Sequence, residues 1–197
     1  MKISSNFPPI DQIFNQGRTA NGFLNKPVSK ETLIQIYELA KMGPTSMNAQ
    51  PARYIFLTTK EAKELLIPAL MDGNVDKTRK APVTVIVAID TKFYEFLPKI
   101  FPHQPDAASM FIDKPEAAAA NGQRNGSLSG AYFILAARGL GLDCGPMSGF
   151  DAAKVNRAFF PDGRWQTNFL INLGYGDHSL EFERQPRLKF DEVAKIL

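Results

Sequence analysis

Apolar residues recur along the chain at two spacings, one typical of helices and the other of strands. Helices are predicted at residues 30–42, 60–71, 116–140 and 151–160. The first follows a candidate N-cap at Ser29 and stops at Gly43 and Pro44, whereas Pro68 kinks or ends the second. The tail from residue 188 is expected to form another short helix or an extended arm.

Three short segments are rich in β-branched and aromatic residues and predict strands at 53–59, 81–89 and 167–173. Segment 81–89 is almost continuously apolar, so we expect it to be buried on both faces at the centre of a sheet. Because helices and strands interleave without an internal repeat, the chain is expected to be α/β or α+β.

Two stretches depart from these patterns. Residues 98–115 contain four prolines among aromatic residues, which predicts an irregular excursion of the kind that often forms a mobile or functional segment. Within 116–140, Gly122, Gly126 and Gly130 recur at four-residue spacing. Each glycine costs a helix about 1 kcal/mol relative to alanine, so we expect another backbone to pack closely on that face. The alternative is a helix broken near Asn125.

Length and charge narrow the range of functions. The 197 residues carry a net charge of +3, which is typical of a soluble chain that forms one domain over residues 1–197. No block of basic residues favours nucleic acid, and no apolar run is long enough to span a membrane. The N-terminal segment lacks the apolar run of a secretory signal, and Cys144 is the only cysteine, so we expect a cytoplasmic protein.

The candidate chemistry does not come from the side chains usual in metal or nucleophilic catalysis. His103 and His178 are the only histidines, so no mixed Cys and His zinc site is expected in one subunit, and both histidines are expected at the surface. The chain has neither a Gly-x-Ser-x-Gly elbow nor a phosphate-binding P-loop. We therefore expect that any chemistry is borrowed from a cofactor, with no metal and no catalytic side chain assigned.

Four polar, Gly-rich or Pro-rich segments lie between the predicted elements. They are the N-terminal motif GRTANGF (17–23), the PTS loop GPTSMNAQPAR (43–53), the GPMSG segment GLDCGPMSGFD (141–151) and the arginine segment ERQPR (183–187). Each has an ordinary explanation taken alone: a surface Arg-Thr pair, a turn closed by local hydrogen bonds, a Gly-rich loop at a strand edge, and a solvated charge cluster.

Together, in this order and with Gly73, Asn74 and the sequence LGYG, the four segments resemble the FMN-dependent nitroreductase family along nearly the whole chain. More narrowly, the PTS loop, NGSLSGAY, LGLDCGPMSGFD and INLGYGD resemble the malonic semialdehyde reductase branch, which is associated with pyrimidine degradation. The family resemblance implies an α+β sandwich, in which helices flank a mostly antiparallel sheet. It also implies an intertwined homodimer with two FMN sites at the interface, and the small-residue helix from Gly126 to Gly141 is our candidate for the central contact.

The resemblance assigns tight, non-covalent FMN binding to residues in all four segments. The set is Arg18, Thr19, Asn21, Pro44, Thr45, Ser46, Asn48, Asn74, Pro146, Met147, Ser148, Gly149, Arg184 and Arg187. The PTS loop would reach the flavin of the partner subunit, and the GPMSG segment would face flavin N5. This chain departs from the family at Gly17, Asn21 and Gln185, where basic residues are usual, and at Ala52, where tryptophan is frequent.

The implied activity is a two-step hydride transfer in which NADPH or NADH reduces FMN and an oxidant then takes the hydride. The narrower resemblance implies malonic semialdehyde as substrate and 3-hydroxypropionate as product, with Lys99, Lys114 and Arg124 as candidate partners of the substrate carboxylate. Two alternatives stay open: a broad-specificity nitro or quinone reductase with the same fold and flavin, and a flavin-binding protein without turnover.

Overall fold

The computed structural model describes residues 10–197, so most of the N-terminal segment that was expected to lack a secretory signal lies outside them. An antiparallel sheet of four strands forms the centre of the molecule, in the order β1-β2-β4-β3. The strands are β1 (Ala52–Leu57), β2 (Val83–Asp90), β3 (Asp143–Met147) and β4 (Trp165–Gly174). The predicted antiparallel sheet is confirmed, and β2 is an interior strand buried almost throughout, as its continuous apolar sequence indicated.

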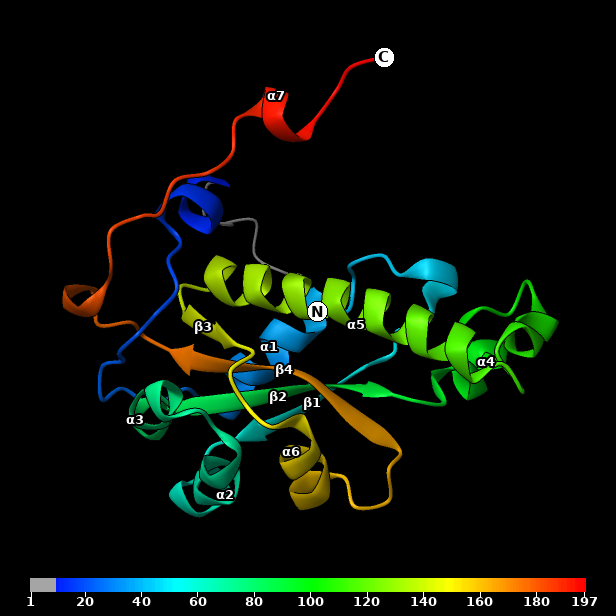
Figure 1. Ribbon diagram of the computed structural model, residues 1–197, viewed down its shortest axis with the longest axis horizontal. Helices are drawn as coiled ribbons and strands as arrows, with labels where there is room; N and C mark the ends of the chain where they lie inside the picture. Colours follow the sequence, from blue (N-terminus) through cyan, green and yellow to red (C-terminus); the bar gives the residue numbers. More distant parts are fainter. Residues whose placement is uncertain (1–9) are drawn as a thin grey trace.

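Helices cover both faces of this sheet (Figure 1). On one face, α1 (Lys30–Ala40) and α5 (Pro115–Gly139) pack over a core that includes Ile36, Val85 and Phe133. On the other face, α2 (Lys60–Leu66) and α6 (Ala152–Phe159) pack against Ile86 and Leu170, and α3 (Asp72–Lys80) lies beside α2. The remaining short elements are η1 (Gln12–Gln16), η2 (Ser46–Asn48), η3 (Ile67–Ala69), η4 (Phe93–Phe96), α4 (Leu97–Ile100), η5 (Pro105–Met110), η6 (His178–Leu180) and α7 (Phe190–Val193).

The sequence signals for the start of α1 and for the end of α2 agree with the structure. The side chain of Ser29 accepts a hydrogen bond from the Thr32 N–H at 3.1 Å and caps α1. The α2 helix ends before Pro68, and α5 is a continuous helix, so the alternative of a break near Asn125 is wrong. The tail from residue 188 contains both expected forms, because the short α7 is followed by extended chain.

Two sequence predictions are corrected, and one helix was missed. The segment 141–151 is not only a loop, because Asp143–Met147 pairs with β4 and forms an edge strand. The α3 helix was not predicted, since its sequence is mostly polar and it buries only Thr78. The Pro-rich excursion is not irregular: it folds into short helices around Phe93 and Phe111, and prolines begin several of them, where a missing N–H costs nothing.

The glycines of α5 allow close packing, but against side chains rather than another backbone. A Cβ at Gly126 would lie 2.9 Å from Ile89 Cγ1, and one at Gly130 would lie 2.3 Å from Phe169 Cζ. Both contacts are within the same chain, where the helix crosses the sheet. The glycine face of α5 is therefore filled by β2 and β4, and only its outer face is left for a second subunit.

The C-terminal segment leaves the body of the molecule as an extended arm (Figure 1). Several of its apolar side chains are exposed in the single chain: Phe182, Leu188, Phe190, Val193 and Ile196. Contiguous exposed apolar surface is typical of interaction sites. Within residues 10–197, no helix is both long and apolar enough to cross a membrane.

Candidate functional site

The N-terminal motif lies along the free edge of β3. Thr19 forms a parallel bridge with Cys144, and the Ala20 N–H donates to the Cys144 carbonyl at 3.0 Å. A Cβ on Gly145 would lie 2.6 Å from the Ala20 carbonyl oxygen, so only glycine permits this approach. Two of the four predicted segments, 17–23 and 141–151, are therefore adjacent in space.

The arginine segment folds back onto the same motif. Arg18 donates to the Phe182 carbonyl and lies 3.9 Å from Glu181, while Arg184 donates to the Gly17 carbonyl at 3.2 Å. Arg18 and Arg184 thus hold the N-terminal motif against the C-terminal segment, each through a backbone carbonyl. Arg187 instead donates to the carbonyls of its neighbours Gln185 and Pro186 and does not join this group.

Asn74 joins the GPMSG segment through α3. Its side-chain Nδ2 donates to the Gly149 carbonyl at 2.8 Å, and the Met71 N–H donates to the same carbonyl at 3.0 Å. A Cβ on Gly149 would lie 2.7 Å from Asn74 Nδ2, so the glycine keeps this contact open. Ser148 is exposed and Met147 is buried, which places backbone and small polar groups at the surface beside Asn74.

A fully buried polar network supports this part of the site from below. Asn172 on β4 accepts a hydrogen bond from Thr84 Oγ1 at 2.8 Å and donates from Nδ2 to Thr78 Oγ1 at 3.1 Å and to Met147 Sδ at 3.6 Å. The network therefore ties two strands to α3, which carries Asn74, and to β3, which leads to Gly149. The role of Asn172 was not predicted, since a single amide within an apolar strand gives no signal of what it contacts.

The PTS loop is held in an unusual backbone conformation. Met47, Asn48 and Gln50 have φ angles of 54°, 50° and 41°, a region that non-glycine residues adopt at a cost of about 1–3 kcal/mol each. Such strain persists only where the surroundings fix it, and it concentrates at functional sites. Here the Gln50 N–H donates to Thr45 Oγ1 at 3.2 Å, and Asn48 Nδ2 donates to the Ile100 carbonyl at 2.8 Å.

The long helix α5 supplies two further supports for this loop. The buried side chain of Asn125 accepts a hydrogen bond from the Ser46 N–H at 2.8 Å, and Tyr132 donates to the Pro44 carbonyl at 3.0 Å. From the sequence, Asn125 was named only in the alternative of a broken helix. Its position one residue before Gly126, on the buried face, was the signal of a structural role.

Within one chain, the PTS loop lies apart from the other three segments. The PTS loop leads into β1, whereas the N-terminal motif and the GPMSG segment lie on β3, and these strands are opposite edges of the sheet. Three interstrand spacings, about 14 Å in total, separate the two edges. In Figure 1 the turn before β1 lies near the α4 end of α5, and the N-terminal motif lies near β3 at the other end.

Titratable side chains near β3 are not poised for nucleophilic or metal chemistry. Burial raises the pKa of the Cys144 thiol to about 12, so the thiol stays protonated at neutral pH. Both histidines are exposed as predicted, and the hydrogen bond that His178 Nδ1 donates to the Glu181 carboxylate raises the pKa of His178. Within residues 10–197, no three His, Cys, Asp or Glu side chains are grouped so that they would hold a metal ion.

A groove of about 640 Å³ lies between the end of β2 and the start of α5. Tyr94 and Phe111 line it together with Lys92 and Lys114. Of the three cations that the sequence analysis considered for a substrate carboxylate, only Lys114 lines this groove, and Lys99 and Arg124 are exposed elsewhere. The groove therefore combines an aromatic wall with two cations and one carboxylate, that of Asp113.

Comparisons with known proteins identify a matching family and similar relatives. The sequence matches the nitroreductase family over residues 18–175. A relative from Stenotrophomonas maltophilia, provisionally named NADH dehydrogenase/NAD(P)H nitroreductase, is 57% identical over 187 residues, or 95% of each chain.

Two solved structures confirm the predicted α+β fold. A protein from Bacillus subtilis, provisionally named a nitroreductase, superposes with a TM-score of 0.86 at 25% identity over 94% of this chain and 97% of its own. A similarly named protein from Exiguobacterium sibiricum, in complex with FMN, has a TM-score of 0.86 at 21% identity over 100% and 99% of the two chains.

Proposed function

The chain belongs to the nitroreductase family, and on that premise we propose that it is an FMN-dependent oxidoreductase that uses NADH or NADPH as reductant. When bound, FMN supplies the hydride chemistry, which explains why no catalytic triad is needed. The relative's name supports a nicotinamide reductant, and the FMN complex of the Exiguobacterium protein supports the cofactor.

The residues of this chain fit both ends of FMN, its phosphate and its ring system. Arg18 and Arg184 provide two cations beside Gly17 for a dianionic phosphate, each worth about 1.5–3 kcal/mol in a charge-assisted hydrogen bond. Asn74 would hold the pyrimidine edge of the ring through its amide. Gly149 leaves an uncluttered face beside it, where a bulkier residue would meet Asn74 Nδ2.

The position of the PTS loop supports a homodimer with shared sites. Because this loop lies at the opposite sheet edge from Arg18, Asn74 and Gly149, one chain supplies two half-sites that lie apart from each other. A second copy related by two-fold symmetry would place its PTS loop against the first copy's N-terminal motif. The exposed apolar arm at the C-terminus would be covered in the same assembly. Sedimentation of only a 21.8 kDa species at micromolar concentration would contradict this dimer.

We propose malonic semialdehyde as substrate, reduced to 3-hydroxypropionate, on the motifs of the narrower resemblance. Lys92 and Lys114 in the aromatic-walled groove provide cations of the kind that a short carboxylate requires. The second candidate is a nitro or quinone reductase, which the name of the Stenotrophomonas relative favours. The assigned residues are the same for both, so substrate kinetics must separate them.

Anaerobic stopped-flow absorbance of the flavin band at about 450 nm tests the proposal. NADPH or NADH should bleach the band, and malonic semialdehyde should restore it, with parallel double-reciprocal plots in the steady state. Recovery only with nitroaromatics or quinones would favour the second candidate. A purified protein without affinity for FMN, or one whose bound FMN neither reductant bleaches, would overturn the enzymatic proposal.

A further inference from the structure

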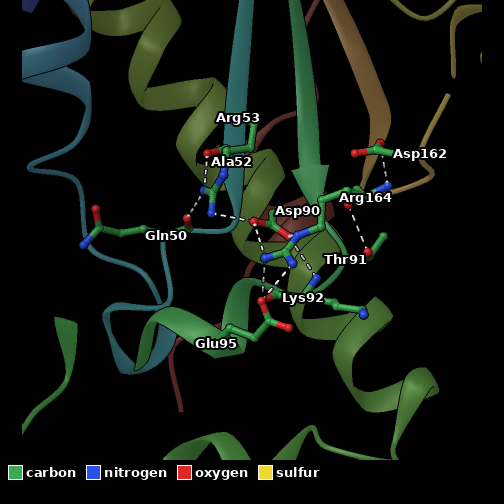
Figure 2. Close-up of polar contacts among 9 residues, drawn as sticks. All are labelled: Gln50, Ala52, Arg53, Asp90, Thr91, Lys92, Glu95, Asp162 and Arg164. Carbon is green, nitrogen blue, oxygen red and sulfur yellow. Dashed lines mark hydrogen bonds and ion pairs between the residues drawn. The ribbon is translucent and has the colours of Figure 1, made fainter. Parts of the chain in front are cut away.

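A second polar cluster lies at the end of β2, among residues that no flavin role was assigned to. Asp90 is the last residue of β2 and is 1% exposed. Its carboxylate accepts hydrogen bonds from Arg53 Nη2 at 2.8 Å, Arg164 Nε at 2.5 Å and the Lys92 N–H at 3.0 Å (Figure 2). A buried carboxylate is tolerated only when it is paired in this way.

Arg53 connects this buried carboxylate to the PTS loop. While Nη2 binds Asp90, Nη1 donates to the carbonyls of Gln50 and Ala52, both at 2.9 Å. Figure 2 shows the Arg53 guanidinium between the Gln50 carbonyl and the Asp90 carboxylate. Gln50 is one of the residues with a positive φ angle, so Arg53 forms a hydrogen bond directly to the strained turn.

We propose that Arg53 and Asp90 are positioning residues for the flavin: Asp90 fixes Arg53, and Arg53 fixes the left-handed turn that orients Ser46 and Asn48. The proposal rests on the proposed function, in which the PTS loop contacts FMN. The planar guanidinium is essential because it donates in two directions at once, whereas an ammonium is a point charge without that fork. A loose turn would bind FMN less tightly, because the loop would have to be ordered at the moment of binding.

Arg164 provides a matched control at the same carboxylate. It binds Asp90 through Nε and Nη2, and its other contacts go to Glu95 at 2.8 Å and to the Lys92 carbonyl at 3.3 Å. Arg53→Lys and Arg164→Lys therefore remove the same chemical feature from the same buried group. A role in stability alone predicts equal consequences, whereas positioning predicts that only Arg53→Lys reaches the flavin loop.

Two measurements on the apoprotein compare the variants. Fluorescence titration with FMN should give a Kd about tenfold higher for Arg53→Lys than for Arg164→Lys, a difference of about 1.4 kcal/mol. Amide hydrogen exchange should accelerate in the peptide that spans residues 44–52 for Arg53→Lys but not for Arg164→Lys. Gln50→Gly serves as a rescue background, because glycine adopts a positive φ without strain. This change also removes the hydrogen bond from Gln50 Nε2 to Asn48 Oδ1 at 2.8 Å, so the effect of Arg53→Lys is measured relative to Gln50→Gly alone. In that background Arg53→Lys should raise the FMN Kd less than twofold.

Equal FMN affinities of the two lysine variants, or unchanged exchange in residues 44–52 of Arg53→Lys, would overturn the positioning role. So would an Arg53→Lys effect that Gln50→Gly leaves undiminished. If the wild-type protein did not bind FMN, the proposed function would fail. The exchange comparison alone would then still decide whether Arg53 holds the turn.

Discussion

Replacing Asn172 with leucine tests the buried network that joins the sheet to α3 and β3. Asn172 is completely buried, and leucine has a similar volume but no polar atoms. The change leaves the hydroxyl of Thr84 without its acceptor and the hydroxyl of Thr78 with only its 3.9 Å contact to Met147 Sδ. An unsatisfied buried polar group costs about 1–3 kcal/mol, so we expect a loss of about 2–4 kcal/mol in the free energy of unfolding.

In a chain of this size, each kcal/mol corresponds to about 2–4 °C in Tm, which predicts a fall of about 5–15 °C. Urea unfolding of the apoprotein followed by circular dichroism measures the free energy, and a thermal scan measures Tm. The double variant Thr84→Val/Asn172→Leu removes the orphaned hydroxyl and should recover about 1–2 kcal/mol relative to Asn172→Leu alone. A loss below about 0.5 kcal/mol in the single variant, or strictly additive losses in the double variant, would refute the reasoning.

Two further predictions concern α5 and β3. Gly130→Ala should destabilise the protein by about 1–3 kcal/mol, because its Cβ would meet Phe169 Cζ at 2.3 Å. Gly139→Ala has open space around it and should stabilise the protein by about 0.4–1 kcal/mol. Urea unfolding must therefore give changes of opposite sign in the free energy of unfolding for the two variants. Cys144 should resist alkylation in the folded protein at pH 8 and react after unfolding. Because burial raises the pKa of Cys144 from 9.0 to about 12, the unfolded state loses this proton first, and stability falls as pH rises above about 9. Relative to Cys144→Ala, the wild type should lose about 1.4 kcal/mol more between pH 8 and pH 10, and equal losses would show that the thiol is not buried as described.

The elements with strong periodicity could be predicted from the sequence, and the polar ones could not. The continuous apolar run in β2 predicted an interior strand because both of its faces are buried. Strand β3 was missed because Gly145 and Pro146 weaken a strand signal, although proline is acceptable at a sheet edge. The α3 helix was missed because it buries only Thr78 and therefore lacks an apolar face.

The candidate site was identified from four segments and their order, and the structure brings three of those segments together. Arg18 and Arg184 join the N-terminal motif to the C-terminal segment, and Asn74 contacts Gly149, but Arg187 binds only neighbouring carbonyls. The separation of the PTS loop from the other segments depends on strand order, which the spacing of residues along the chain does not encode. The supports Asn125, Asn172 and Asp90 are single polar residues in apolar surroundings, and their partners come from distant parts of the sequence.

The central claim is that each FMN site takes half of its residues from each of two copies. Complementation between two inactive variants tests it most directly. Arg18→Ala/Asn74→Ala removes one half-site, and Ser46→Ala/Asn48→Ala removes the other. Each variant alone should retain little FMN after gel filtration. When equal amounts are unfolded together and refolded, half of the dimers should be mixed, and each mixed dimer has one intact site.

The refolded mixture should therefore recover about a quarter of the wild-type FMN content and NAD(P)H-dependent flavin reduction. FMN content no higher in the mixture than in the separate variants, although mixed dimers form, would contradict the shared site.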